Sequence, residues 1–175
     1  LFLILMRYEG RLSPNLYVPF FNFSIALSWP LYMVFAAFVI VGCVNAVNIT
    51  DGLDGLSTSV TIPVALFFVS AATWWSYKQL GIFAAALLGG LLGFLLFNAH
   101  PAKVFMGDTG SLFLGGAVAG MAFAFDMPLV LALVGIIYIV ETLSDIIQVT
   151  YFKLSHGKRI FKMAQALAGD DPEKM

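Results

Sequence analysis

The sequence predicts an all-α integral membrane protein with about five transmembrane helices, whose polar loops gather on one side of the bilayer. Its 175 residues are 61% hydrophobic and only 11% charged, and the mean hydropathy is +0.94. A soluble domain carries about 25% charged residues, so this chain lacks the polar surface that keeps a protein in water. Apolar runs near the roughly 20 residues needed to span a bilayer also recur along it.

The first part of the chain predicts an interfacial loop or hairpin and three full crossings. Residues 7–29 mix charges, prolines and aromatic side chains, which is typical of an interfacial loop or hairpin. Three apolar runs follow: Pro30 to about Val47, about Leu53 to Trp75, and Leu80 to Phe97. Each is long enough to cross a bilayer, and Pro63 predicts a kink in the second.

The last part of the chain predicts two more crossings. The uncharged run 112–125 is short, about 21 Å long at about 1.5 Å per residue, against a hydrocarbon core of about 30 Å. It crosses only with help from tilted neighbours, a thinned bilayer or buried polar ends, and a re-entrant segment is the alternative. Pro128 to Phe152 is long enough for a final crossing. We therefore divide the chain into a membrane domain, residues 1–164, and a polar tail, residues 165–175.

The distribution of basic residues favours five crossings. With that number, most Lys and Arg residues share one side, and only Arg7, Arg11 and Lys78 fall on the other. The positive-inside rule makes the first side cytoplasmic. Two polar loops, residues 45–56 and 97–111, then meet on the cytoplasmic side. The basic residues on that side are Lys103, Lys153, Lys158, Arg159, Lys162 and Lys174.

Small residues predict where these helices pack closely. Gly89 with Gly93, and Gly116 with Gly120, have the four-residue spacing that lets membrane helices approach one another. The single cysteine, Cys43, lies in an oily run and predicts ordinary helix packing. A formal net charge of −1 argues against nucleic acid as a partner.

Two carboxylates lie in the first polar loop, NAVNITDGLDGL (residues 45–56). Asp51 and Asp54 are three positions apart at the predicted start of a helix. One interpretation is a helix cap, with Asp51 accepting hydrogen bonds from free amides and Asp54 in the first turn. The other is a ligand site, because asparagines precede the carboxylates and two glycines would let a ligand approach the backbone.

The second polar loop, FNAHPAKVFMGDTGS (residues 97–111), places Asp108 just before another predicted helix. Capping is again one interpretation. The other is a Mg²⁺ site, because magnesium takes one or two carboxylates and leaves its other positions to water and substrate phosphates. Helix N-termini nearby favour an anionic substrate. The combination predicts phosphoryl chemistry, while the lack of a GxxxxGK[ST] motif argues against a P-loop hydrolase.

Three more side chains of the second loop each have two interpretations. His100 either donates to a phosphate or braces the loop before Pro101. Lys103 either neutralises phosphate charge or anchors the loop at the lipid headgroups. Phe105 either stacks on a base or packs as an ordinary aromatic side chain.

A polar stripe marks the last predicted helix. Glu141, Ser144, Asp145 and Gln148 recur at helical spacing and therefore share one face. Charged side chains within a membrane helix are costly and face a partner or a cavity, so both structural pairing and a cavity lining stay open. The basic segment KLSHGKRIFK that follows is either an electrostatic membrane anchor or part of a substrate entrance.

The two polar loops, together with YFKLSHGKRIFKMA (residues 151–164), resemble motifs of the phospho-N-acetylmuramoyl-pentapeptide transferases. RLSPNLYVPFF (residues 11–21) resembles the loop that precedes them, so the resemblance covers residues 1 to about 164. It implies a multi-pass enzyme of the bacterial inner membrane that acts in peptidoglycan synthesis. Such an enzyme transfers phospho-MurNAc-pentapeptide from UDP-MurNAc-pentapeptide to undecaprenyl phosphate, giving lipid I and UMP. It uses Mg²⁺, and the family is often homodimeric.

The resemblance also implies catalytic and metal-binding roles. Asp108 would be the ligand of Mg²⁺, with Asn48 as a second contact. Asp51 would lie beside the pyrophosphate and ribose. We assign catalytic roles to these two aspartates and to Asp54, because a metal and fixed donors would stabilise charge on a transferring phosphoryl group.

A uridine pocket is implied by the same motifs. Asp54, Asn98 and Phe105 would form it, with Phe105 stacked on uracil. His100, Lys103 and Ser111 would support this loop, and His100, Lys103 and Gly107 would contribute to substrate binding.

The sequence departs from the family's pattern in three ways. The family's aspartate-rich DDxxK motif and its histidine-rich PxHHHFE segment are not matched, so we expect a chain truncated at both ends. Asp145 stands where an apolar residue is expected. These departures leave alternatives open: a catalytically inactive remnant or subunit, a sister polyprenyl-phosphate N-acetylhexosamine-1-phosphate transferase, or a transporter that uses the stripe containing Glu141 and Asp145.

Overall fold

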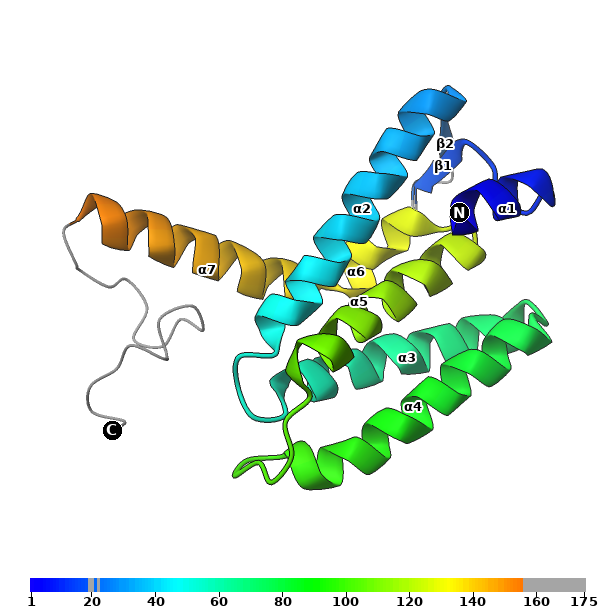
Figure 1. Ribbon diagram of the computed structural model, residues 1–175. Helices are drawn as coiled ribbons and strands as arrows, with labels where there is room; N and C mark the ends of the chain where they lie inside the picture. The colour runs from blue at the N-terminus through cyan, green and yellow to red at the C-terminus, as the bar shows by residue number, and fades with distance from the viewer. Residues whose placement is uncertain (19–20, 22, 156–175) are drawn as a thin grey trace.

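The computed structural model describes residues 1–18, 21 and 23–155, and this part of the chain is mostly helical (Figure 1). It begins with the short helix α1 (Phe2–Tyr8) and an antiparallel hairpin of β1 (Asn15–Val18) and β2 (Phe23–Ala26). Of the two forms predicted for residues 7–29, a loop or a hairpin, the structure has the hairpin. The remaining elements are α2 (Trp29–Thr50), α3 (Leu56–Trp74), α4 (Lys78–Asn98), α5 (Gly107–Ala124), η1 (Pro128–Val130), α6 (Leu131–Val134) and α7 (Ile136–Leu154).

Three helices of the described part are long and apolar enough to cross a membrane, namely α2, α3 and α4. Their bounds lie within a few residues of the three predicted crossings, so those predictions are confirmed. A fourth span is possible by length and composition if η1, α6 and α7 form one broken crossing. By length and composition, the described residues thus contain three or up to four candidate crossings, compared with the about five predicted. The helix α5 is not among the spans because it begins at Gly107, and its first turn includes the polar residues of GDTGS.

The predicted last crossing is broken. The helical segments on either side of Gly135 form an angle of 73°, so the predicted crossing from Pro128 to Phe152 is either a broken span or a re-entrant loop. Figure 1 shows α7 projecting away from the other helices after this bend. Because the residues on both sides of the bend are equally apolar, hydropathy alone does not reveal it.

Two pairs of helices form the bundle, α2 with α5 and α3 with α4. Close packing of the first pair depends on Gly115, where an added Cβ would lie 2.6 Å from the Cα of Val44. The predicted glycine pairs do not mark such contacts. A Cβ added at Gly89, Gly93, Gly116 or Gly120 would meet nothing within 4 Å among the described residues. The four-residue spacing of glycines places small residues along one face of a helix, but it does not determine whether that face packs against a neighbouring helix.

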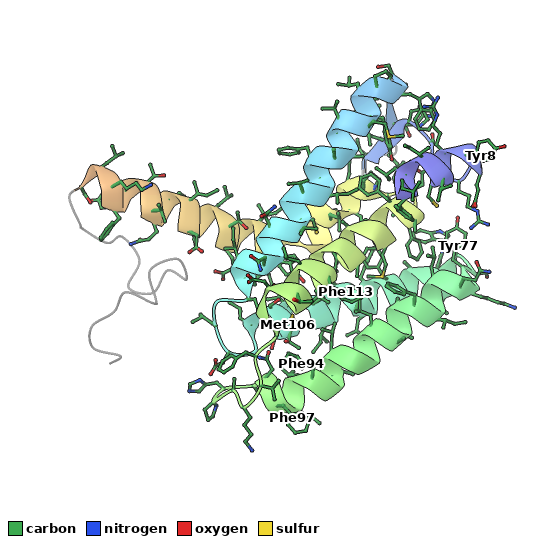
Figure 2. The ribbon with its side chains drawn as sticks, viewed as in Figure 1. Tyr8, Tyr77, Phe94, Phe97, Met106 and Phe113 are labelled. Carbon is green, nitrogen blue, oxygen red and sulfur yellow. The ribbon has the colours of Figure 1, made fainter. Side chains whose placement is uncertain are left out.

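The bundle has a polar end and an aromatic end. The turn between α2 and α3 and the loop between α4 and α5 lie at the same end in Figure 1. Figure 2 shows Phe97 and Met106 near this end, with Tyr8 and Tyr77 at the opposite one. The guanidinium of Arg7 stacks 4.2 Å from the ring centre of Trp29, at the start of α2. Both polar loops are therefore brought together, as their sequences predict.

Two calls lie outside the described residues. The boundary between the membrane domain and the tail, at residues 164 and 165, is one of them. The basic residues Lys158, Arg159, Lys162 and Lys174 are the other. Of the predicted basic cluster, only Lys153 belongs to a described element, the last turn of α7.

Candidate active site

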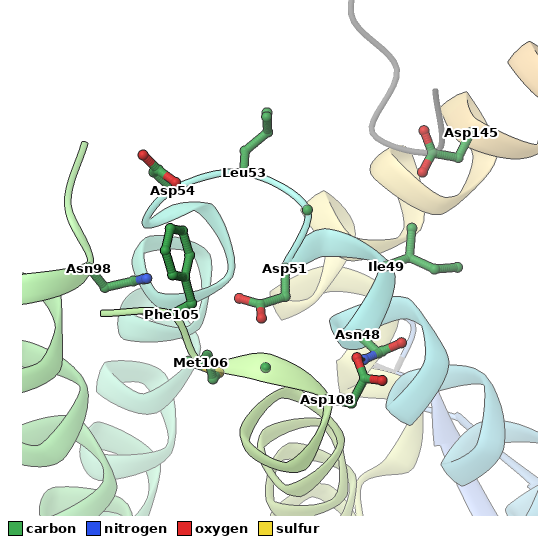
Figure 3. A pocket seen from close by; sticks show the side chains of 12 residues that line it. Asn48, Ile49, Asp51, Leu53, Asp54, Asn98, Phe105, Met106, Asp108 and Asp145 are labelled. Atoms are coloured by element: carbon green, nitrogen blue, oxygen red, sulfur yellow. The ribbon is translucent and has the colours of Figure 1, made fainter. Parts of the chain in front are cut away.

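A pocket of about 420 Å³ opens at the polar end of the bundle (Figure 3). The end of α2, the turn after it, the end of α4, the start of α5 and one residue of α7 line it. Its size suits a nucleotide-sized ligand, since small-molecule sites commonly occupy about 300–1,000 Å³. Seven of the nine residues that the sequence assigns to a site line this pocket: Asn48, Asp51, Asp54, Asn98, Phe105, Gly107 and Asp108.

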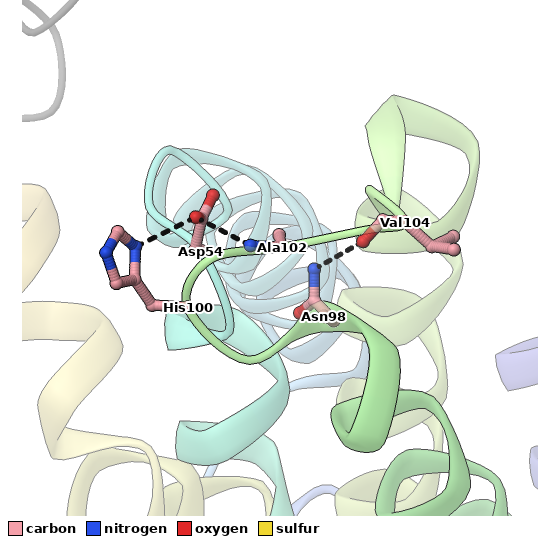
Figure 4. Close-up of polar contacts among 5 residues, drawn as sticks. All are labelled: Asp54, Asn98, His100, Ala102 and Val104. Carbon is pink, nitrogen blue, oxygen red and sulfur yellow. Dashed lines mark hydrogen bonds and ion pairs between the residues drawn. The ribbon is translucent and has the colours of Figure 1, made fainter.

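Asp54 joins the two polar loops. Its Oδ2 atom accepts a hydrogen bond of 3.0 Å from the backbone N–H of Ala102 and lies 3.1 Å from Nδ1 of His100 (Figure 4). The loops also touch at Gly55, which has φ +71°, and an added Cβ there would lie 3.2 Å from the carbonyl oxygen of Asn98. Glycine meets both requirements, because it adopts positive φ without strain and leaves room for the second backbone.

Asn98 fixes the second loop from below. Its side chain is buried, its Oδ1 accepts a hydrogen bond of 2.7 Å from Thr58 Oγ1, and its Nδ2 donates one of 3.0 Å to the carbonyl oxygen of Val104. Phe105 follows directly and is 72% exposed. The aromatic ring is thus held at the pocket on an anchored backbone while its face stays open to a ligand.

The capping interpretations of the two loops are wrong in detail. The helix α2 continues to Thr50, so Asp51 stands at its C-terminal end, and α3 begins only at Leu56 with Gly55 as its cap. Neither α3 nor α5 has a side-chain cap hydrogen bond. Asp108 lies in the first turn of α5, where a negative charge is favoured by the helix dipole. Hydropathy cannot locate these ends, because polar residues continue α2 and begin α5.

Asn48 positions Asp108 across the contact between α2 and α5. Its Nδ2 donates to Asp108 Oδ1 at 3.2 Å and to Ser111 Oγ at 2.8 Å. Ser111 is fully buried and lies one turn after Asp108. The contact connects two loops that are 60 positions apart in the sequence. Asn48 therefore holds the carboxylate through its nitrogen, and a direct contact with a metal would use its oxygen.

Asp51 lies between the two groups of polar residues in Figure 3. Burial raises the pKa of its carboxyl above the ordinary value, and the nearby charge of Asp108 raises this pKa further. A cation bound in the pocket would favour the ionised form of Asp51, which burial and the charge of Asp108 disfavour.

The donor set fits magnesium rather than a metal that needs many protein ligands. The described residues contain no group of three or more His, Cys, Asp and Glu side chains placed to hold a metal. Magnesium commonly binds through one or two carboxylates and completes its coordination with water and phosphates. Asp108 and Asp51, with the amide of Asn48 beside them, meet that requirement.

Two predicted residues do not line the pocket, His100 and Lys103. The side chain of His100 is 84% exposed and pairs with Asp54, which agrees with the interpretation that it braces the loop. Its peptide bond to Pro101 is cis. Lys103 is exposed, and its backbone N–H donates to the carbonyl oxygen of Phe97 at 2.8 Å.

Asp145 on α7 lines the pocket although the sequence did not assign it to the site. The signal was present in the polar stripe of the last helix, for which a cavity lining was one of two interpretations. Asp145 and Gln148 are buried, whereas Glu141 and Ser144 are partly exposed and do not line the pocket. The stripe is thus not a single functional unit.

Comparisons with known proteins match both polar loops. The profile of "Glycosyl transferase family 4" matches residues 1–126. A phospho-N-acetylmuramoyl-pentapeptide-transferase of Clostridium acetobutylicum is 50% identical over 154 residues, which cover 88% of this chain and 48% of that protein. A protein with the same name from Caldanaerobacter subterraneus is 52% identical over 156 residues, covering 89% and 49%. One from Clostridium perfringens is 54% identical over 153 residues, covering 87% and 48%. The chain spans about half the length of these curated relatives.

Proposed function

Because the chain belongs to glycosyl transferase family 4, we propose that its pocket is the nucleotide and metal site of a membrane enzyme that transfers phospho-MurNAc-pentapeptide. The donor is UDP-MurNAc-pentapeptide and the acceptor is undecaprenyl phosphate. An oxygen of the acceptor phosphate forms a bond to the sugar-bearing phosphorus, the bond from that phosphorus to UMP breaks, and the products are lipid I and UMP. The names of the relatives and their identity of about 50% support this choice of substrate.

The nucleoside end of the donor would bind beside Phe105. Its exposed ring stacks on uracil, and base stacking on an aromatic side chain contributes about 1–3 kcal/mol. Asn98 shapes this end because it holds the backbone on which Phe105 stands. Asp54 acts as a positioning residue, since its Oδ2 atom already receives the N–H of Ala102. His100, Lys103 and Gly107 complete the loop around the nucleoside.

The phosphate end would bind beside Asp51 and Asp108. Asp108 is the proposed ligand of Mg²⁺, and Asn48 keeps its carboxylate in place with a hydrogen bond. When bound, Mg²⁺ supplies the positive charge that stabilises a transferring phosphoryl group. Asp51 contributes a second carboxylate on the same side of the pocket and orients the pyrophosphate and ribose.

The proposal places the protein in the bacterial inner membrane with this pocket facing the cytoplasm. The positive-inside rule supports this orientation, because Lys103 lies on a loop at the pocket, whereas Arg11 and Lys78 line a hollow with Tyr77, at the opposite end of the molecule. A cysteine replacing Lys158 would then react only with reagents that reach the cytoplasm. Labelling from outside would contradict the orientation.

The observation that carries the proposal is the single pocket shared by Phe105, Asp51 and Asp108. It is tested by measuring UMP release and donor binding by the purified chain in detergent, with UDP-MurNAc-pentapeptide, undecaprenyl phosphate and Mg²⁺. Asp108→Asn should abolish metal-dependent UMP release. Phe105→Ala should weaken donor binding by roughly 1–3 kcal/mol, the scale of base stacking.

Two controls make this experiment decisive. Glu9→Gln changes a carboxylate that pairs with Arg11 far from the pocket, so it should leave both measurements unchanged. UDP-GlcNAc replaces the donor in a parallel reaction, and a preference for it would favour the sister transferase. Donor binding that is equal in the Phe105→Ala variant and the original chain would contradict the proposal.

A further inference from the structure

The helix α7 brings one carboxylate to the pocket from a direction that no other element uses. Asp145 is only 6% exposed, and its Oδ1 atom has no hydrogen-bond partner among the described residues. Figure 3 shows its carboxylate pointing away from α7, on the side of the pocket opposite Phe105 and Asn98. The bend of 73° after α6 gives α7 the direction that places this residue at the pocket.

A buried, charged carboxylate without a hydrogen-bond donor or a counter-charge raises the free energy of the folded protein. Removing a charged group from water without compensation is strongly unfavourable, and buried charges in proteins are normally paired. The described ion pairs join Glu9 with Arg11 and Asp54 with His100, and neither includes Asp145. None of the residues that line the pocket is Lys, Arg or His. Among the described residues nothing supplies a counter-charge to Asp145, and a ligand in the pocket can bring one.

The position of Asp145 narrows the kind of group that brings this charge. The ligand's nucleoside end lies beside Phe105 and its phosphates lie beside Asp51 and Asp108, on the proposed function. Asp145 then faces the portion of the ligand beyond the phosphates. A second metal ion is less suited to this place, because Asp145 is the pocket's only lining residue from α7 and the described residues form no cluster of three metal-binding side chains.

We propose that Asp145 forms a further subsite that binds a positively charged amino group on the peptide portion of the substrate. An ammonium supplies both the charge and the N–H donors that the carboxylate lacks, and charge-assisted hydrogen bonds are roughly twice as strong as neutral ones. This inference rests on the proposed function, since it takes the ligand to be a nucleotide that carries a peptide. The proposal gives α7, which lies outside the two polar loops, a role in substrate specificity.

The test compares two donors that differ only in this charge. One is UDP-MurNAc-pentapeptide with a single lysine in its peptide, and the other is the same compound acetylated at the lysine amine. Binding of both to the full 175-residue chain in detergent is measured by calorimetry. The unaltered chain should bind the free amine about tenfold more tightly. Asp145→Asn should reduce this preference to within about twofold, whereas the matched control Glu141→Gln on the same helix should keep it.

Every other outcome contradicts the subsite in a distinguishable way. Equal binding of both donors by the unaltered chain, or a preference that survives in Asp145→Asn, overturns the subsite and leaves the proposed function intact. Failure of the unaltered chain to bind either donor overturns the proposed function and the subsite together. A titration with Mn²⁺ alone tests the metal alternative. If Asp145→Asn binds one Mn²⁺ ion fewer than the unaltered chain, Asp145 binds a metal cation and the ammonium subsite is overturned.

Discussion

The two sides of the pocket differ in how their polar groups are satisfied. On the loop side, Asp54 and Asn98 form hydrogen bonds with the chain itself, to Ala102, Val104 and Thr58. On the α7 side, Asp145 is more deeply buried than Asp54, and yet its Oδ1 atom has no hydrogen-bond partner among the described residues. Polar residues of one pocket can therefore differ in role. Asp54 and Asn98 on the loop side hold the pocket together, whereas Asp145 on α7 is available to bind a ligand.

The largest expected change in stability comes from removing the hydrogen bonds of Asn98 on the loop side of the pocket. Asn98→Leu should lower the free energy of unfolding by about 2–4 kcal/mol, because two hydrogen bonds are lost and the hydroxyl of Thr58 is left buried without its acceptor. Denaturation followed by circular dichroism in detergent measures this loss. Asn45→Leu is the matched control, since Asn45 is exposed on α2. Equal losses in both variants would mean that Asn98 is not an anchor.

The opposite sign is expected on the unsatisfied side. Asp145→Val should raise the free energy of unfolding by about 1–2 kcal/mol in the absence of ligand, because it removes a buried acceptor for which the described residues supply no donor. The same denaturation experiment detects this gain. A loss of stability would show that the carboxylate is already compensated within the protein, and the contrast between the two sides would disappear.

A smaller effect, dependent on pH, is expected for Asp51 at the centre of the pocket. Its pKa is raised in the folded state by burial and by the charge of Asp108. Its contribution to stability is therefore fully present below the pKa of the unfolded chain, about 3.9, and is lost as the pH rises through the folded pKa. Asp51→Asn should therefore be as stable as the original chain at a pH below about 3.9 and more stable than the original chain at neutral pH.

The measurement for Asp51 is a series of melting curves without Mg²⁺ across this pH range. Because Asp108 is the second cause of the shift, the pH dependence of the difference should shrink when the comparison is repeated in an Asp108→Asn background. An unchanged dependence would show that the two carboxylates do not interact.

The smallest effect is expected for His100. Its pairing with Asp54 is largely exposed, and surface pairs contribute about 0–1 kcal/mol. His100→Ala should therefore reduce stability by less than about 1 kcal/mol, since the N–H of Ala102 still holds Asp54. A loss of stability as large as that of Asn98→Leu would mean that His100 contributes as much as Asn98 to holding the second loop in place.

The sequence predicted the helices α2, α3 and α4 to within a few residues, because each contains an apolar run long enough to cross a bilayer. For residues 7–29 it predicted an interfacial loop or hairpin, and the structure has the hairpin. The sequence did not predict that α5 begins at Gly107, because the polar residues of GDTGS are compatible with both a loop and a first helical turn. It did not predict the break at Gly135, since the chain is apolar on both sides of it.

The same reasoning explains which site residues were found. Asp51, Asp108 and Phe105 stand in long motifs, and those motifs gather at one end of the bundle. Asp145 stands alone on a helix, and its place at the pocket depends on the bend before it. The glycine pairs failed for a related reason. The direction that a helix face takes is a tertiary property, and only Gly115 happens to face α2.

The contact between Asp54 and the second loop also constrains how such a chain can change through evolution. The two polar loops meet because α3, with 19 residues, leads away from the pocket and α4, with 21 residues, leads back. At about 1.5 Å per residue these helices are about 28 and 32 Å long. A turn inserted into one of them would carry Ala102 away from Asp54 unless a turn were inserted into the other. The lengths of α3 and α4 should therefore covary among relatives, even where their sequences have diverged.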